Sequence, residues 1–350
     1  KKKIKKKDLK ICITAQHREM LDDVLKLFKI FPDYDLNVMK KNQSLSRLTS
    51  NIIIKFEKIL DKFKPNLTLV HGDTTTTFAI TLANFYKKLP VAHIEAGLRT
   101  NNIYSPWPEE ANRKITDLLS SMHFVPINNS KKNILKENIS SKCLKITGNT
   151  VIDALLFTKK NILRNKILRK QMDKQFKFSD KKIILVTAHR RENFGKGILE
   201  LCKSLKYIVK TRTDVQIIYP VHPNPNIKNI VYKKLSNIKN INLIKPVNYL
   251  SMVYLMMKSY LIVTDSGGVQ EEAPSLSKPI VILRDVTERP EIIKMGGGVL
   301  VKRNQLEIVK TVNKILDNNK IYKKMSSIKN PYGDGKASSR IVKEILNFHF

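Results

Sequence analysis

The sequence is poor in cysteine. Its 350 residues include three cysteines, Cys12, Cys143 and Cys202, which stand far apart and form no Cys-x-x-Cys pair. No cysteine lies near histidines at the spacing of a zinc site. The composition therefore excludes a scaffold built on disulfides and gives no indication of a structural metal.

Long hydrophobic runs are also absent. The apolar stretches are short, such as residues 183–186, whereas a membrane-spanning helix needs about 20 apolar residues. No apolar segment of the signal-peptide type follows the basic first residues. We therefore expect a cytoplasmic protein. A chain of 350 residues with 42% hydrophobic content is long enough for two domains, each with its own core.

Acidic residues are scarce relative to basic ones. The chain has 65 Lys and Arg against 30 Asp and Glu, which gives a net charge of +35. Such an excess is typical of proteins that bind nucleic acid. Here, however, the lysines are spread over expected helix surfaces, without an arginine-rich helix or an aromatic RNA-binding motif. We favour a solvated basic surface over a nucleic-acid site, with residues 1–7 as the one plausible basic tail.

Apolar strand candidates alternate with helical patterns along the chain. Strands are expected over residues 9–14, 67–70, 91–94, 183–186, 215–219, 241–244, 261–263 and 280–283, and helices over residues 19–31 and 76–87. This alternation predicts an α/β protein of two doubly wound, Rossmann-like domains facing across a cleft. We expect an N-terminal domain over residues 1–147, a C-terminal domain over residues 148–336, and a helix over residues 337–350 that crosses back to the N-terminal domain. No expected strand is followed by Gly-x-Gly-x-x-Gly, which disfavours a nicotinamide oxidoreductase.

The most informative segment runs from residue 261 to residue 279. A β-branched strand there leads into Ser266, Gly267 and Gly268 and then into Glu271 and Glu272. Glycines let backbone N–H groups approach an anion at the start of a helix, and carboxylates can accept hydrogen bonds from sugar hydroxyls. The pattern indicates a nucleotide site, although a plain tight turn between a strand and a helix would look the same in sequence.

Carboxylates follow the strands of the first half, at the sheet edge where open parallel sheets carry their chemistry. Asp73 follows residues 67–70, Glu95 follows residues 91–94, and Glu109 follows Pro108. Asp73 could instead cap a helix, and Glu109 could be a first-turn charge. Glu95 is harder to explain without a ligand, because an acid at the buried mouth of a sheet needs a partner.

Two histidines follow strands of the second half. His189 comes after residues 183–186 and could be a surface residue, but at the end of a strand it is well placed to face a phosphate. His222 stands between prolines, and we interpret it as a loop-packing residue.

These segments together resemble the non-hydrolysing bacterial UDP-N-acetylglucosamine 2-epimerases, which have a glycosyltransferase-B-like fold. The resemblance covers most of the chain, in the order of the family's motifs. It rests on residues 14–20, 71–77, 93–100, 104–113, 148–154, 189–193, 265–275, 284–291 and 330–335.

The resemblance implies reversible conversion of UDP-N-acetylglucosamine to UDP-N-acetylmannosamine through 2-acetamidoglucal, for cell-surface polysaccharide synthesis, without a metal or nicotinamide cofactor. It implies a homodimer as well. By resemblance the catalytic residues are Asp73, Glu95, Glu109 and His189, the substrate-binding residues are Ser266, Gly267, Gly268, Glu272 and Arg289, and a second, activating UDP-N-acetylglucosamine would meet Gln16, His17 and Gln43. The sequence leaves open which carboxylate is the acid and which is the base.

Two alternatives stay open at this point. A hydrolysing relative on the same scaffold would release UDP and free N-acetylmannosamine. A degenerate protein would bind a nucleotide sugar, or nucleic acid through its basic surface, without catalysis.

The start of the chain departs from the family's pattern. The family opens with a strand and a Gly-Thr-Arg-Pro-Glu turn, whereas residues 1–7 here are Lys-rich and residues 9–14 correspond to the family's second strand. A doubly wound sheet without its central strand would leave two edges facing an open slot, and each unsatisfied buried group costs about 1 to 3 kcal/mol. We therefore expect a weakly stable and poorly active polypeptide. The chain could be a fragment, the gene could have decayed, or residues 1–7 could pair in the slot, which we favour least because mostly charged residues make a poor central strand.

Overall fold

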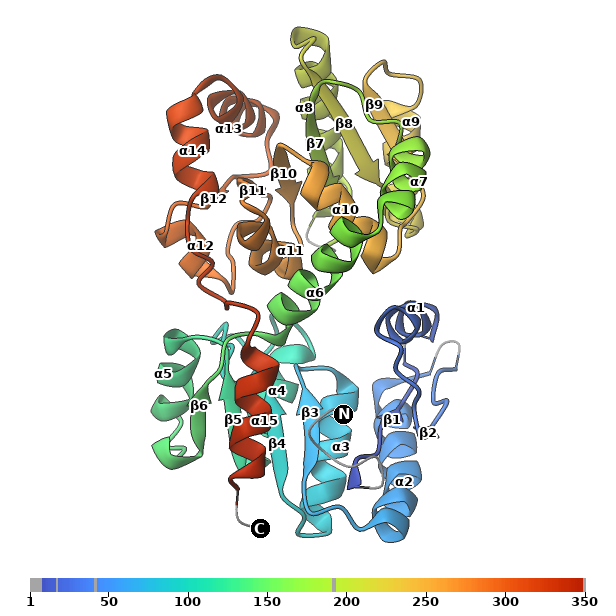
Figure 1. Ribbon diagram of the computed structural model, residues 1–350, viewed down its shortest axis with the longest axis vertical. Helices are drawn as coiled ribbons and strands as arrows, with labels where there is room; N and C mark the ends of the chain where they lie inside the picture. The colour runs from blue at the N-terminus through green and yellow to red at the C-terminus, as the bar shows by residue number, and fades with distance from the viewer. Residues whose placement is uncertain (1–7, 17, 41–42, 191–192, 349–350) are drawn as a thin grey trace. The chain divides into compact units, whose positions relative to one another are not determined.

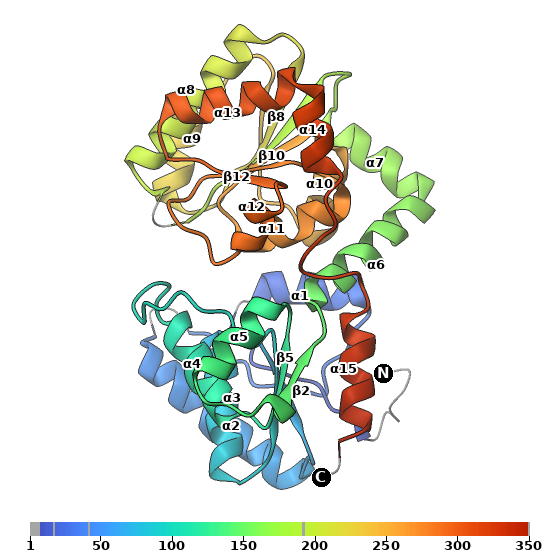
Figure 2. The ribbon, with the colours of Figure 1, turned by 90° about the vertical axis from the view of Figure 1, so that its left-hand side faces the viewer.

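The computed structural model describes residues 8–16, 18–40, 43–190 and 193–348. The chain divides into two compact units, one made of residues 1–150 and 335–350 and the other of residues 151–334. Both are α/β units with parallel sheets, as the sequence predicts (Figure 1, Figure 2). None of the helices in the described ranges is long and apolar enough to cross a membrane.

The second unit contains a six-stranded parallel sheet in the order β12-β11-β10-β7-β8-β9. Its strands are β7 (Lys182–Thr187), β8 (Val215–Pro220), β9 (Ile241–Ile244), β10 (Leu261–Thr264), β11 (Ile280–Ile282) and β12 (Gly298–Leu300). Read from β9 with β7 counted as the first strand, this is the strand order of a doubly wound sheet. The order reverses between β7 and β10, which is where such sheets bind ligands.

The helices of the second unit connect and cover these strands. They are α6 (Thr150–Arg164), α7 (Lys166–Phe176), α8 (Lys196–Thr211), α9 (Pro225–Leu235), α10 (Tyr249–Lys258), α11 (Gly267–Glu272), α12 (Pro290–Lys294), α13 (Gln305–Asp317) and α14 (Asn319–Ser326). Asparagine begins several of them: the side chains of Asn248, Asn304 and Asn318 accept hydrogen bonds from the first turns of α10, α13 and α14. This sequence, rich in Asn, therefore uses its asparagines as helix N-caps.

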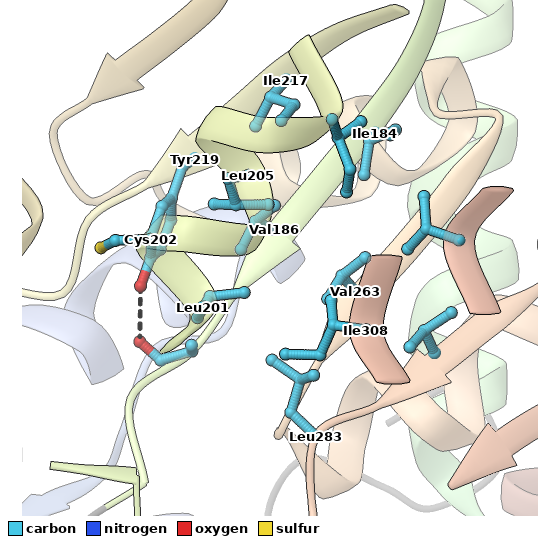
Figure 3. Close-up of a cluster of buried hydrophobic side chains, with 14 of the residues drawn as sticks. Ile184, Val186, Leu201, Cys202, Leu205, Ile217, Tyr219, Val263, Leu283 and Ile308 are labelled. Carbon is cyan, nitrogen blue, oxygen red and sulfur yellow. Dashed lines mark hydrogen bonds between the residues drawn. The ribbon is translucent and has the colours of Figure 1, made fainter. Parts of the chain in front are cut away.

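The core of the second unit packs β-branched strand residues against α8 and α13. Figure 3 shows Val186, Val263, Leu201 and Ile308 in this cluster, all of which are buried. Tyr219 on β8 is fully buried, and its hydroxyl donates to the carbonyl of Ala188 at 3.3 Å (Figure 3). This bond ties the chain just after β7 to the core.

The first unit contains two separate parallel sheets. One pairs β1 (Cys12–Ile13) with β2 (Tyr34–Asp35), and the other has the order β3 (Thr68–His71), β4 (Val91–Ile94), β5 (Met122–Val125), β6 (Leu144–Ile146). The strand expected over residues 9–14 is therefore shorter than predicted. Among the described residues, β1 pairs with a strand on one side only, so few backbone hydrogen bonds are available to lengthen it.

Helices of the first unit lie on both faces of the four-stranded sheet, and others stand beside the two-stranded sheet (Figure 1, Figure 2). They are α1 (Arg18–Phe28), α2 (Leu45–Phe63), α3 (Thr75–Tyr86), α4 (Glu109–Leu119), α5 (Asn128–Lys136) and α15 (Ala337–Leu346). The helix expected over residues 19–31 ends earlier, because Lys29 has a left-handed φ of 53°. Figures 1 and 2 show α15 on one face of the sheet and α3 and α4 on the other, and Ile341 of α15 packs against Ala92 and Phe124.

A cavity of about 490 Å³ separates β1 from β3. It is lined by β1, by β3 and by apolar residues of α2 that include Phe56, Ile59 and Phe63. In the second unit the corresponding place, between β8 and β10, is filled by β7. Among the described residues, β1 and β3 each have one edge that faces this cavity; residues 1–7, which the sequence offers as a possible strand there, lie outside them.

The open slot predicts unequal stability within the protein. Amide protons of β1 and β3 should exchange with solvent at least about tenfold faster than those of β7 and β10, a difference of about 1.4 kcal/mol in opening free energy. Hydrogen exchange followed by mass spectrometry would measure this, with β4 as the internal reference for the first unit. Equal protection of β1 and β7 would contradict the prediction.

Candidate active site

Asp73 stands on the turn between β3 and α3. Gly72, just before it, has a left-handed φ of 72°, which glycine adopts without strain. Arg113 on α4 donates from Nη2 to Asp73 Oδ2, and Asn112 Nδ2 donates to the Asp73 carbonyl at 3.0 Å. Asp73 is not the cap of α3, because Thr74 holds that position and accepts from the N–H of Thr77. The helix-cap alternative for Asp73 is therefore wrong.

Glu95 follows β4 and lies beside the turn that carries Asp73. Its Oε1 accepts from Asn149 Nδ2 at 2.9 Å, and its Oε2 is 3.9 Å from His71 Nε2. A Cβ on Gly72 would lie 3.3 Å from Glu95 Oε2, so glycine at this position leaves room for the carboxylate. The structure thus brings Asp73 and Glu95 together at the ends of neighbouring strands.

Glu109 and Glu110 begin α4 but have different environments. Glu110 is fully buried, accepts from the N–H of Thr100 at 3.1 Å and forms an ion pair with Arg113. Glu109 is half-buried and stands four residues before Arg113, on the same face of the helix. Because Arg113 contacts Asp73, the face of α4 that carries Glu109 and Arg113 is turned toward Asp73. Glu110 has a structural role, because it holds Thr100 and Arg113 in place.

Sequence reasoning gave no role to Arg113, Asn149 or Asp265. All three lie within motif segments of the resemblance, and Arg113 follows Glu109 at helical spacing. Their partners are distant in sequence, so the contacts themselves left no local signal.

Of the three residues expected at a second nucleotide-sugar site, the structure describes Gln16 and Gln43. Gln16 follows β1, and its Oε1 accepts from Thr76 Oγ1 at 3.1 Å. Gln43 precedes α2, and its side-chain oxygen is buried without a hydrogen-bond partner among the described residues. His17 lies outside the described residues.

In the second unit, Asp265 organises the turn after β7. It is fully buried and accepts hydrogen bonds from the backbone N–H groups of His189 and Arg190, both at 2.9 Å, and from Asn193 Nδ2 at 2.6 Å. Because Asp265 directly follows β10, it links the two strands between which the sheet order reverses. His189 is thus held at the edge where a ligand is expected.

The imidazole of His189 is accessible and stacks on another histidine. Its side chain is 40% exposed, and the ring centroids of His189 and His222 are 5.7 Å apart. The N–H of Asn224 donates to Nδ1 of His222 at 3.2 Å. Burial, with the nearby His189, lowers the pKa of His222, so His222 is a neutral packing partner for His189.

The Ser266-Gly267-Gly268 turn lies against Arg289. α11 begins at Gly267, and the N–H groups of a first helical turn have no acceptor within the helix. A Cβ on Gly267 would lie 2.8 Å from Arg289 Nη1, so only glycine admits the guanidinium there. Arg289 Nε also donates to Glu271 Oε1 at 2.6 Å, so Glu271 holds Arg289 rather than standing ready for a sugar hydroxyl.

Glu272 is buried next to Tyr249. The Tyr249 hydroxyl donates to Glu272 Oε1 at 2.7 Å. Burial raises the pKa of Glu272 to about 7, although the hydrogen bond from Tyr249 opposes the shift. The protonation of this carboxyl group therefore changes within the physiological range.

No cluster of three or more His, Cys, Asp or Glu that could hold a metal ion occurs in the described ranges. The carboxylates at the strand ends of the first unit are suited to proton transfer, and the N–H donors and cationic side chains of the second unit are suited to anion binding.

Comparisons with known proteins agree with this geometry. A family model described as UDP-N-acetylglucosamine 2-epimerase matches residues 2–346. The UDP-N-acetylglucosamine 2-epimerase of Escherichia coli K12 is 51% identical over 342 residues, which cover 97% of this chain and 91% of that protein. The enzyme of the same name from Neisseria meningitidis is 52% identical over 339 residues, which cover 96% of this chain and 91% of that protein.

Solved structures show the same likeness. A crystal structure of UDP-GlcNAc 2-epimerase from Neisseria meningitidis, bound to UDP-GlcNAc, matches with a TM-score of 0.93 and 51% identity, covering 97% of this chain and 92% of that one. A structure of MnaA from S. aureus with UDP matches with a TM-score of 0.87 and 43% identity, covering 96% and 88%. The match of the family model along almost the whole sequence shows that this chain belongs to the UDP-N-acetylglucosamine 2-epimerase family.

Proposed function

We propose that this protein interconverts UDP-N-acetylglucosamine and UDP-N-acetylmannosamine by inverting C2 of the sugar. The observation that carries the proposal is the pair of carboxylates, Asp73 and Glu95, held at neighbouring strand ends in a chain of the 2-epimerase family. Inversion at C2 needs one group to remove the proton and another to return a proton on the opposite face.

The route to inversion is elimination followed by re-addition. C2 is not next to a carbonyl group, so simple removal of its proton would leave an unstabilised carbanion. In the elimination, the C2 proton passes to a carboxylate, the electrons of the C–H bond form the C1–C2 double bond, and the electrons of the C1–O bond leave with UDP. The 2-acetamidoglucal so formed takes a proton at C2 from the other face as UDP returns to C1, which balances the reaction without an oxidant or reductant.

The proton-transfer groups we assign are Asp73, Glu95 and Glu109 in the first unit. Arg113 can only donate hydrogen bonds, so it occupies Asp73 Oδ2 and directs proton exchange to Oδ1. Asn149 donates to Glu95 Oε1 and so fixes the orientation of that carboxylate. General acid–base catalysis requires a proton carrier to lie within about 3 Å of its target, and a fixed carboxylate meets this requirement more often than a mobile one.

The nucleotide-binding groups we assign belong to the second unit. Loss of UDP from C1 places growing negative charge on the diphosphate, which positive charge and N–H donors stabilise. His189, Arg289 and the backbone of Ser266, Gly267 and Gly268 supply them. Glu272 is assigned to the ribose hydroxyls.

Several further features belong to the same proposal. We assign Gln16, His17 and Gln43 to a second UDP-N-acetylglucosamine that activates the enzyme; the buried, unpartnered oxygen of Gln43 supports a ligand there. We also propose a homodimer, a cytoplasmic location and a role in cell-surface polysaccharide synthesis.

Proton NMR of UDP-N-acetylglucosamine incubated with the protein in deuterated water tests the reaction. We expect deuterium to enter C2 while UDP-N-acetylmannosamine accumulates, because the proton returned to C2 comes from a group that exchanges with solvent. An Asp73→Asn variant should lower the rate by about 100-fold or more. Release of free N-acetylmannosamine, or the absence of deuterium at C2, would contradict the proposal.

Substitution of Gly267 tests the assignment of Arg289. In Gly267→Ala, the new Cβ displaces the guanidinium, and we expect the Kd for UDP to rise by about tenfold, or about 1.4 kcal/mol. In Gly268→Ala the Cβ meets no atom within 4 Å, so the rise should be several-fold smaller. Calorimetric titration would measure both, and equal losses would show that Arg289 is not the reason.

The pKa of Glu272, raised to about 7, predicts pH-dependent binding of UDP. Below pH 7 the carboxyl group is mostly protonated, and above it the carboxylate accepts stronger hydrogen bonds from ribose hydroxyls. We expect Glu272→Gln to match the parent protein at pH 6 and to bind UDP about three- to tenfold more weakly at pH 8. The ratio of the two Kd values cancels the ionisation of UDP itself, and a ratio that does not change with pH would refute the assignment.

A further inference from the structure

His93 lies on β4, two residues before Glu95, and is fully buried. Its Nδ1 is 2.6 Å from Asp117 Oδ1, and its Nε2 is 2.8 Å from the carbonyl oxygen of Gly72. The ring therefore joins α4, which carries Asp117, to the turn that carries Asp73. Neither His93 nor Asp117 has a role in the reaction steps assigned above.

The two partners of His93 determine its charge. A carbonyl oxygen can only accept a hydrogen bond, so Nε2 carries a proton. Asp117 is also an acceptor, because its Oδ2 receives hydrogen bonds from Arg99 Nη2 at 2.7 Å and from the N–H of Gly97 at 3.1 Å. With an ionised Asp117, Nδ1 must carry a proton as well, and the ring is an imidazolium.

The pKa shifts agree with this geometry. Burial alone would raise the pKa of Asp117, but His93 and Arg99 hold it at about 2. Burial alone would lower the pKa of His93, but the charge and hydrogen bond of Asp117 raise it above its ordinary value. Each group keeps the other charged.

Other titratable groups surround the His93–Asp117 pair. Arg99 also pairs with Glu137, at 2.6 Å. Glu95 raises the pKa of His93 from the active-site side. The neighbouring histidine, His123 on β5, has a pKa lowered by burial and is therefore neutral, with Nε2 2.7 Å from the backbone oxygen of Asp117.

We infer that His93 is a positioning residue whose protonated ring, held by Asp117, fixes the Gly72-Asp73 turn and directs the positive end of the ion pair toward that turn. The inference rests on the proposed function, in which Asp73 and Glu95 exchange protons with the sugar. Gly72 is held on both sides, since its N–H donates to the carbonyl of Ile94 at 3.0 Å and its carbonyl accepts from His93. These two bonds fix the direction in which the chain runs from the end of β3 to Asp73.

The charge serves the chemistry as well as the geometry. Carboxylates gathered in one pocket repel one another, which disfavours the ionised form needed for proton removal. The His93 ring lies between Asp117 and Gly72, so the positive end of this ion pair is the end nearer the Asp73 turn and offsets part of the repulsion. A neutral histidine could make one of the two hydrogen bonds but would supply no charge.

Replacement of His93 tests the positioning role. We expect His93→Gln to lower kcat by about 100-fold, with KM for UDP-N-acetylglucosamine changed by less than about threefold, because the turn moves while the nucleotide groups stay in place. The acidic limb of the pH–rate profile should move to higher pH as the positive charge is lost. His123→Gln is the matched control, since it removes a buried histidine that does not touch the turn, and it should lower kcat by less than about threefold. Equal losses in the two variants would overturn the inference.

The protonation state can be measured without turnover. In ¹⁵N NMR spectra of the protein, both ring nitrogens of His93 should still be protonated above the ordinary histidine pKa of about 6.5. In Asp117→Asn, which keeps the side-chain shape, the ring should lose a proton at a lower pH than in the parent protein. Loss of a ring proton in the parent protein at or below the ordinary histidine pKa would overturn the inference even if the enzyme is active. If the parent protein shows no epimerisation, the proposed function fails, and a protonated ring that responds to Asp117→Asn still supports the inference.

Discussion

Buried carboxylates that accept backbone N–H groups hold the turns on which the site residues stand. Asp265 receives the N–H groups of His189 and Arg190, Asp117 receives that of Gly97, and Glu110 receives that of Thr100. All three carboxylates are buried, and each joins its helix or strand end to a separate loop or turn. A buried carboxylate is costly unless its oxygens are satisfied, so each one forces its turn into a single arrangement.

The sequence predicts the fold class and the strand-end positions well, because β-branched runs and the residues after them are local signals. Asp73 and Glu95 were found in this way, and the structure places them together. Asp265 and Arg113 were given no role, because their partners lie on other strands or helices and no spacing rule connects them. The strand expected over residues 9–14 is shorter in the structure, because strand length depends on a neighbour that pattern alone cannot supply.

The basic residues of this protein fall into two groups, dispersed lysines and arginines paired with carboxylates. The excess of lysine is spread over the sequence and gives no motif, whereas two arginines near the site have a fixed acidic partner: Arg289 pairs with Glu271 and Arg113 with Asp73. A guanidinium held on one side by a carboxylate presents its remaining N–H groups in a fixed direction. Net charge is therefore a poor guide to this site, and the pairing of individual side chains is a better one.

The return of α15 to the first unit has a consequence for the synthesis of the protein. The first unit is interrupted in the sequence, because residues 151–334 form the second unit and α15 follows them. Ile341 of α15 packs against Ala92 and Phe124 in the core of the first unit. On the ribosome, the first unit therefore stays without this helix until the whole second unit has been made, and its nascent sheet exposes apolar surface for that time.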